Sequence, residues 1–119
     1  MPCPVALSAC ISIWLAVHGY QPAQREAVVR QLWTESRLQP CVVVPGGAYL
    51  AQWTGPRLRR VKAQFGPGCP SWNKQLEMID WELRNEPDFQ AFWSAKSGQE
   101  FKVLRVTFGR GERWRGQSG

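Results

Sequence analysis

The segment Leu32–Gly55, LWTESRLQPCVVVPGGAYLAQWTG, is where an apolar helix pattern gives way to a loop rich in proline and glycine. Val28 and Leu32 fall on one helical face, and Glu35 lies seven residues after Val28 on that same face. A carboxyl group among apolar side chains such as Leu32 and Trp33 loses hydration, which raises its pKa. It can then carry a proton near neutral pH, as a general acid that protonates a glycosidic oxygen must.

A second interpretation of Glu35 stays open on sequence alone. Most glutamates at helix ends are solvated or ion-paired, and Arg37 is close enough in sequence to pair with Glu35. The first interpretation predicts a catalytic acid, and the second predicts an ordinary surface residue.

Length and charge limit the class of protein. The chain has 119 residues, of which 44% are apolar, and this suits one domain with a modest core. Lys and Arg outnumber Asp and Glu by 15 to 9, and the net charge of +6 favours an anionic partner. Nucleic acid, cell wall and membrane surface all meet that description. The seven tryptophans can fill the core or stack on sugar rings and bases.

The four cysteines lack the paired spacing of a zinc site, and the single His18 cannot complete a Cys and His cluster, so we expect no metal. Cys41 and Cys69 flank the loop and the helix after it. In an oxidising compartment, a disulfide between them would restrain the flexible segment that they enclose. Four free, buried thiols are the alternative.

The N-terminal residues are apolar and need separate treatment. Residues 1–17 carry no charged side chain, and Leu7–Cys10 resembles a lipoprotein cleavage site. No Lys or Arg precedes the apolar run, which is too short and too broken to span a membrane. We therefore expect 1–10 to be an extension, 11–109 the folded domain, and 110–119 a flexible basic tail, with a signal or lipid anchor as the alternative for the N-terminus.

Proline, glycine and capping residues divide the domain into helices. Three consecutive valines followed by Pro45, Gly46 and Gly47 predict a loop or small hairpin over 41–49. The first expected helix runs over 11–18 and is closed by Gly19, and the second runs from Pro22 to before Pro40. The third runs from Pro56, with Thr54 or Gly55 as cap, to before Gly66, and the fourth from Trp72, with Ser71 as cap, to before Pro87. The fifth runs from its cap Asp88 to before Gly98, and the segment that begins at Glu100 is expected to be helical to about Phe108.

Charged residues on two of these helices allow alternative interpretations. Arg57, Arg59, Arg60 and Lys62 lie off the apolar face of their helix, and we expect a solvated basic surface in preference to a phosphate site. Glu82 lies beside the apolar stripe of the following helix. It either fixes an arginine or backbone groups under the site, or is a surface residue.

Four sequence segments carry a resemblance to a known family. They are TES at Thr34–Ser36 followed by Pro40, GGAYLAQWTGPR at Gly46–Arg57, QLEMIDWEL at Gln75–Leu83 and GERW at Gly111–Trp114. Together they resemble the phage tail lysozyme group of the lysozyme-like superfamily, in the right order over roughly residues 11 to 115. The resemblance implies a compact, mostly α-helical domain with a short loop or small hairpin after the catalytic helix.

The resemblance also implies an activity, which is cleavage of the β-1,4 bond between N-acetylmuramic acid and N-acetylglucosamine in peptidoglycan. The family's acid falls on Glu35. Gln52 would donate a hydrogen bond to an acetamido sugar, and Trp53 would pack under the groove. Tyr49 stands where this group often has a glycine. The expected substrate-binding residues are Gly47, Tyr49, Gln52, Trp53 and Thr54, and the expected supporting residues are Ser36 and Glu82.

The mechanism and partners follow from the same resemblance. No Asp follows Glu35 in the loop to act as a nucleophile, which fits enzymes with one essential glutamate. Such enzymes either activate water or let the 6-hydroxyl of muramic acid attack. We expect a monomer that acts on glycan strands in the periplasm or at the cell wall, with no cofactor, no specific nucleic acid and no membrane span. The alternative is a non-catalytic basic module that binds nucleic acid or cell wall.

Overall fold

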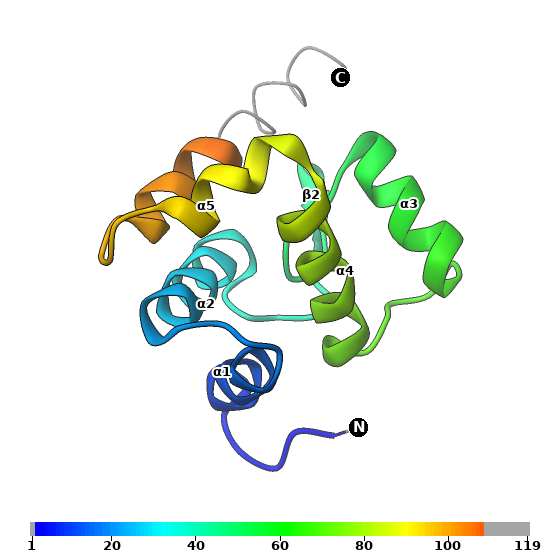
Figure 1. Ribbon diagram of the computed structural model, residues 1–119. Helices are drawn as coiled ribbons and strands as arrows, with labels where there is room; N and C mark the ends of the chain where they lie inside the picture. Colours follow the sequence, from blue (N-terminus) through cyan, green and yellow to red (C-terminus); the bar gives the residue numbers. More distant parts are fainter. Residues whose placement is uncertain (1, 109–119) are drawn as a thin grey trace.

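The computed structural model describes residues 2–108, and it is mostly helical with one small antiparallel hairpin (Figure 1). This confirms the expected fold class. The predicted basic tail over 110–119 and the GERW segment lie outside the described residues. The elements are α1 (Leu7–Val17), α2 (Pro22–Ser36), β1 (Val43–Val44), β2 (Gly47–Ala48), α3 (Gly55–Phe65), α4 (Trp72–Asn85), the 3-10 turn η1 (Pro87–Phe89), α5 (Gln90–Ser94) and a last helical segment over 100–108.

Helix α1 begins at Leu7, earlier than the predicted start at Ile11. A disulfide between Cys3 and Cys10 fastens the preceding residues to the first turn of this helix. Gly19 has a φ of +91° and follows the last turn, as predicted for a helix-ending glycine. Part of the expected N-terminal extension therefore belongs to the folded domain.

Helix α2 begins at Pro22, as predicted, because proline needs no N–H partner in the first turn. Gln21 and Gln24 exchange hydrogen bonds with each other's backbone N–H and form a capping box. The helix ends at Ser36, before Pro40, because Arg37 and Leu38 take left-handed φ values of 55° and 57°. The loop therefore starts directly after Glu35 and Ser36.

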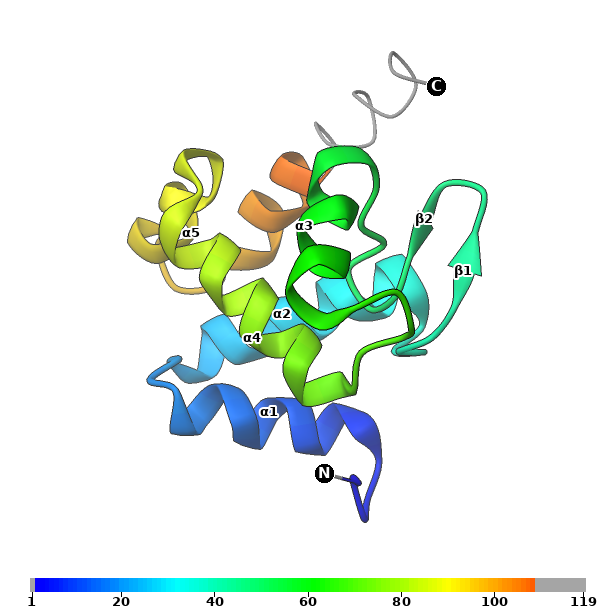
Figure 2. The same cartoon turned by 90° about the vertical axis from the view of Figure 1, so that its right-hand side faces the viewer.

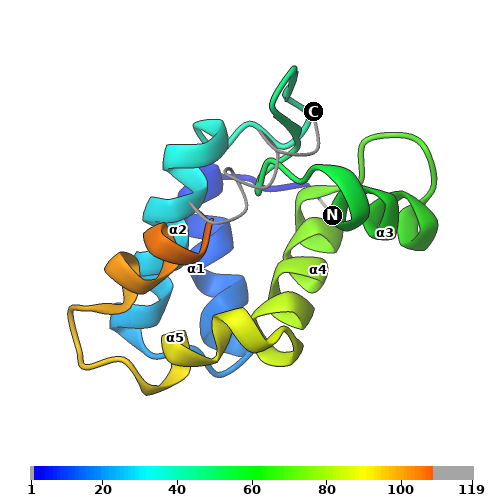
Figure 3. The same ribbon diagram turned by 90° about the horizontal axis from the view of Figure 1, so that it is seen from above.

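One hydrophobic core lies between the long helices. Figure 2 shows α1 running beneath α2 and α4, and Figure 3 shows α2 and α4 on opposite sides of the centre with α5 at one end. Helix α3 lies on the outside of α4 and contributes the buried Val61 to the core. Fully buried side chains from every layer meet in this core: Ile11, Leu15, Leu32, Leu50, Trp53, Val61, Leu76, Phe92 and Leu104.

The segment after α4 differs from the sequence prediction. Asp88 was expected to cap a helix, but it lies inside η1, a 3-10 turn closed by the N–H of Phe89 donating to the carbonyl of Glu86. Pro87 cannot continue the α4 hydrogen-bond pattern, so the chain tightens there before α5 begins. The short α5 still buries Phe92 completely.

A buried tyrosine connects α4 to the start of α2. Tyr20 is 2% exposed, and its hydroxyl donates to Oδ1 of Asp80 at 2.5 Å. Arg84 donates through Nε to the same oxygen and through Nη2 to the carbonyl of His18. Burial, followed by the hydrogen bond to Asp80, raises the pKa of Tyr20 well above its ordinary value.

The raised pKa of Tyr20 predicts a loss of stability in alkali. The folded state holds this proton more tightly than the unfolded state, so the stabilisation is complete below about pH 10 and is lost as the pH rises further. Tyr20→Phe should lower the free energy of unfolding by about 1 kcal/mol at neutral pH. Urea unfolding between pH 7 and 11 should show that gap shrinking above about pH 10. A gap that stays constant would contradict this account.

Candidate functional site

Glu35 lies in the last turn of α2 and is half-buried. Its Oε1 accepts a hydrogen bond of 3.0 Å from Nε2 of Gln31, which is 0% exposed. Trp33 was expected to shield Glu35, but it is 49% exposed and lies on another face of the helix. The guanidinium of Arg37 lies over the Trp33 ring, 4.8 Å from its centre. Residues of α2 near Glu35 that are buried include Gln31, Leu32 and Ser36.

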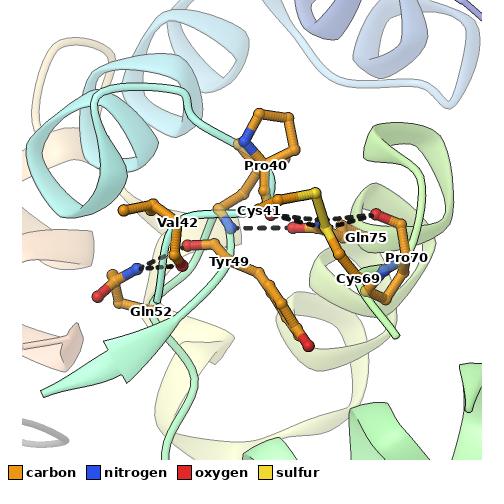
Figure 4. The surroundings of a disulfide bond; sticks show 9 residues. Pro40, Cys41, Val42, Tyr49, Gln52, Cys69, Pro70 and Gln75 are labelled. Atoms are coloured by element: carbon orange, nitrogen blue, oxygen red, sulfur yellow. Dashed lines mark hydrogen bonds between the residues drawn. A yellow bond between two sulfur atoms is a disulfide. The ribbon is translucent and has the colours of Figure 1, made fainter. Parts of the chain in front are cut away.

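The segment after α2 forms a small hairpin, one of the two alternatives that the sequence left open. Val43 pairs with Ala48, and Val44 with Gly47. A disulfide joins Cys41, just before the hairpin, to Cys69, just before α4 (Figure 4). Of the two interpretations of these cysteines, the disulfide is confirmed.

Gln75 is a further anchor of this loop, which sequence reasoning missed (Figure 4). It is 0% exposed. Its Nε2 donates to the carbonyls of Pro40 and Pro70, each at 2.9 Å, and its Oε1 accepts from the N–H of Leu50 at 2.9 Å. One side chain on α4 thus fixes both ends of the loop beside the disulfide. The sequence feature that could have indicated this role is an amide side chain on the apolar face of α4, three residues after Trp72.

The loop backbone is strained. All four non-glycine residues with left-handed φ in the described range 2–108 occur between the end of α2 and the start of α3, namely Arg37, Leu38, Tyr49 and Gln52. Each such residue costs about 1 kcal/mol relative to a relaxed backbone. Tyr49 has a φ of 72°, a conformation that glycine adopts readily. Tyr49 therefore takes a backbone conformation that is typical of a tight turn.

Gln52 and Tyr49 are both buried, at 4% and 5% exposure. The Nε2 of Gln52 donates to the carbonyl of Tyr49 at 2.9 Å (Figure 4). The amide group that was predicted to donate to a sugar thus bonds to the loop backbone. Direct contact of Gln52 with a glycan stays a prediction, while support of the turn is what the geometry shows.

Gly47 is required by a close approach of two backbone segments. A Cβ at this position would lie 2.6 Å from the backbone oxygen of Gln52, whereas a Cβ at Gly68 would meet nothing within 4 Å. Gly47→Ala should therefore lower the free energy of unfolding by about 3 kcal/mol. Gly68→Ala should change it by less than about 0.5 kcal/mol. Urea unfolding of both variants tests this, and equal losses would contradict it.

Trp53 and Glu82 form a buried polar contact beneath the loop. The Nε1 of Trp53 donates to Oε1 of Glu82 at 2.9 Å, and both residues are nearly inaccessible, at 0% and 3% exposure. Arg57 donates to the same carboxylate through Nε at 2.7 Å and Nη2 at 2.9 Å. The interpretation of Glu82 as a residue that fixes an arginine is confirmed.

The basic face of α3 is less solvated than predicted. Arg57 pairs with Glu82, and Arg60 pairs with Glu86 at 2.8 Å. The prediction is wrong for Arg57, because the buried Glu82 carboxylate needs a positive partner. Arg59 stays exposed, as expected.

The remaining predicted residues take structural positions. Thr54 is the N-cap residue of α3 and is half-buried, without a side-chain capping bond. The hydroxyl of Ser36 is buried and donates to the carbonyl of Leu32 at 3.0 Å, which supports the last turn of α2. Within residues 2–108, no three His, Cys, Asp or Glu side chains are grouped as metal ligands would be.

Gln31 was also missed in the sequence, although its spacing four residues before Glu35 places the two side chains together on a helix. The structure therefore brings Glu35 together with an unforeseen amide. It places Gly47, Tyr49, Gln52 and Trp53 inside a loop fixed from α4.

Over residues 2–108, none of the helices combines the length and the apolar character that crossing a lipid bilayer requires. Comparisons with protein-family models, with curated proteins and with solved structures found no match for this chain. The chemistry of the Glu35 region is thus the basis for assigning a function.

Proposed function

We propose that this chain cleaves the β-1,4 bond between N-acetylmuramic acid and N-acetylglucosamine in peptidoglycan, with Glu35 as the general acid. One observation carries the proposal: Glu35 is half-buried at the end of α2, bonded to the fully buried Gln31, directly before a strained and disulfide-tied loop. Partial burial favours the protonated carboxyl that glycosidic bond cleavage needs. Strained backbone is often concentrated at functional sites.

The state of Glu82 favours a mechanism with one essential carboxyl group. Both oxygens of Glu82 are bonded to Arg57 or Trp53, so this carboxylate is held in place as support. Glu35 would transfer its proton to the glycosidic oxygen as the bond from that oxygen to the sugar's anomeric carbon breaks. Water or the 6-hydroxyl of muramic acid would then attack that carbon and return a proton to Glu35. Water leaves a reducing end, and the hydroxyl leaves an anhydro end.

Charge and disulfides agree with a cell-wall substrate. The net charge of +6 would attract an anionic wall over long range. All four cysteines are joined in two disulfides, as is common in the periplasm and outside the cell. The proposal is for a monomer that acts on glycan strands without a cofactor.

The competing proposal is a basic module that binds nucleic acid or cell wall without cleaving it. The ion pairs of Arg57 and Arg60 reduce the free positive charge on α3, and this favours the enzymatic proposal. A nucleic-acid module would bind with an affinity that falls steeply as salt rises, and Glu35 would not affect that affinity.

Digestion of purified peptidoglycan tests the proposal. The soluble products, separated and analysed by mass spectrometry, should contain new muramic acid ends. New reducing ends would indicate hydrolysis, and anhydro ends would indicate transglycosylation. The absence of both, with intact folded protein, would refute the enzymatic assignment and leave the binding module.

A further inference from the structure

The buried amide of Gln31 is paired at one end only. Its Nε2 donates to Oε1 of Glu35 at 3.0 Å, while its own Oε1 has no hydrogen-bond partner. The whole side chain is 0% exposed, so water outside the protein does not reach this oxygen. Buried polar atoms are nearly always bonded, and an unpaired one needs a physical explanation.

The surroundings of Gln31 favour the opposite orientation of its amide. Gln31 and Glu82 line the same internal cavity of about 10 Å³, which is close to the smallest space that holds one water molecule. The remaining lining residues, from α2, α4, η1 and the 100–108 segment, are apolar, so Glu82 is the one titratable group on this lining. Both oxygens of Glu82 accept hydrogen bonds, from Trp53 and Arg57, so this side chain presents acceptors. An acceptor across the cavity favours the orientation in which the N–H₂ group of Gln31 faces inward, rather than the one in which its carbonyl oxygen does.

We propose that Gln31 is a positioning residue whose side-chain amide turns over when Glu35 changes its protonation state. With Glu35 ionised, Nε2 of Gln31 donates to the carboxylate, as the structure shows. With Glu35 protonated, the carboxyl O–H donates to Oε1 of Gln31, and Nε2 turns inward toward the cavity shared with Glu82. Turning the amide by 180° exchanges donor and acceptor with little change in shape.

This behaviour would keep Glu35 in one place while its proton leaves and returns. A protonated carboxyl group still has a carbonyl oxygen that accepts, so an arginine or lysine at position 31 could donate to either form of Glu35 but could not accept its O–H. Glutamine can also accept that O–H, and its inward preference supports this arrangement. The catalytic meaning of this exchange rests on the proposed function of Glu35, whereas the coupling between the two side chains does not.

NMR without any substrate tests the coupling. The carboxyl carbon of Glu35, assigned by its disappearance in Glu35→Gln, is titrated together with the side-chain amide protons of Gln31. We expect nuclear Overhauser contacts from these protons to the methyl groups of Ile79 and Leu83 at low pH. These contacts should be lost with the same midpoint as the Glu35 titration.

The matched control is the amide of Gln75, which is bonded at both ends by backbone groups and should keep its contacts throughout. Contacts of Gln31 that stay unchanged through the titration of Glu35 would overturn the inference. Because no glycan is present, that result would leave the proposed cleavage activity untouched. Conversely, if Gln31 and Glu35 change together with pH in a protein that does not cleave peptidoglycan, the proposed function is refuted and the coupling is not.

Discussion

Glu35→Gln is expected to lower the rate of glycan cleavage by about 100-fold to 10,000-fold, the range that a general acid contributes. The amide has almost the shape of the carboxyl group but cannot release a proton to the glycosidic oxygen. Because Glu35 is half-buried at the end of α2, the fold should survive. Release of soluble muropeptides from peptidoglycan at equal protein concentration measures the effect.

Glu26→Gln is the matched control for this loss. Glu26 is an exposed residue of the same helix, and the substitution removes the same charge from the protein. It should leave the rate within about twofold, since surface substitutions away from a site have small effects. A Glu35→Gln protein that keeps most of its activity, or equal losses in the two variants, would remove Glu35 from the reaction.

Glu82→Gln should lower the free energy of unfolding by about 3 kcal/mol, in the range found when one partner of a buried ion pair is lost. Three N–H donors, one from Trp53 and two from Arg57, converge on the two oxygens of Glu82. Glutamine replaces one of these oxygens with a donor, so at least one buried N–H loses its acceptor. Urea unfolding at pH 7 measures this difference.

Glu86→Gln provides the comparison, because Glu86 also pairs with an arginine of α3 but is 33% exposed. Its loss should cost less than about 1 kcal/mol, as expected for a solvent-exposed pair. If both variants lose the same stability, the buried contact of Glu82 with Trp53 and Arg57 does not stabilise the site.

The helices could be predicted because local signals set their ends. Pro22 starts α2, Thr54 precedes α3 and Ser71 precedes α4, and each signal acts within one or two turns. The start of α1 at Leu7 was missed, since the apolar, uncharged N-terminus was treated as an extension. The 3-10 turn at Pro87–Phe89 was missed because Asp88 fits equally well as a cap or as a turn residue.

The support of the loop could not be predicted, because it depends on contacts between residues far apart in the sequence. Gln75 bonds Pro40, 35 residues earlier, and only the fold brings them together. The buried pairing of Trp53 with Glu82, 29 residues apart, likewise needs α3 and α4 to pack first. Gln31 is the exception, because its spacing from Glu35 is local. Sequence reasoning thus singled out Glu35, whose catalytic role stays a prediction, and missed the amides that bond to it and to its loop.

The dependence of the Glu35→Gln effect on the leaving group tests the central claim most directly. An aryl glycoside of the muramic acid disaccharide with an acidic phenol as leaving group needs little protonation, whereas a natural strand leaves as a poor alkoxide. If Glu35 supplies the proton, the ratio of wild-type to variant rate should be large on natural strands and should fall strongly on the aryl substrate. An equal ratio on both substrates would contradict the assignment of Glu35 as the acid.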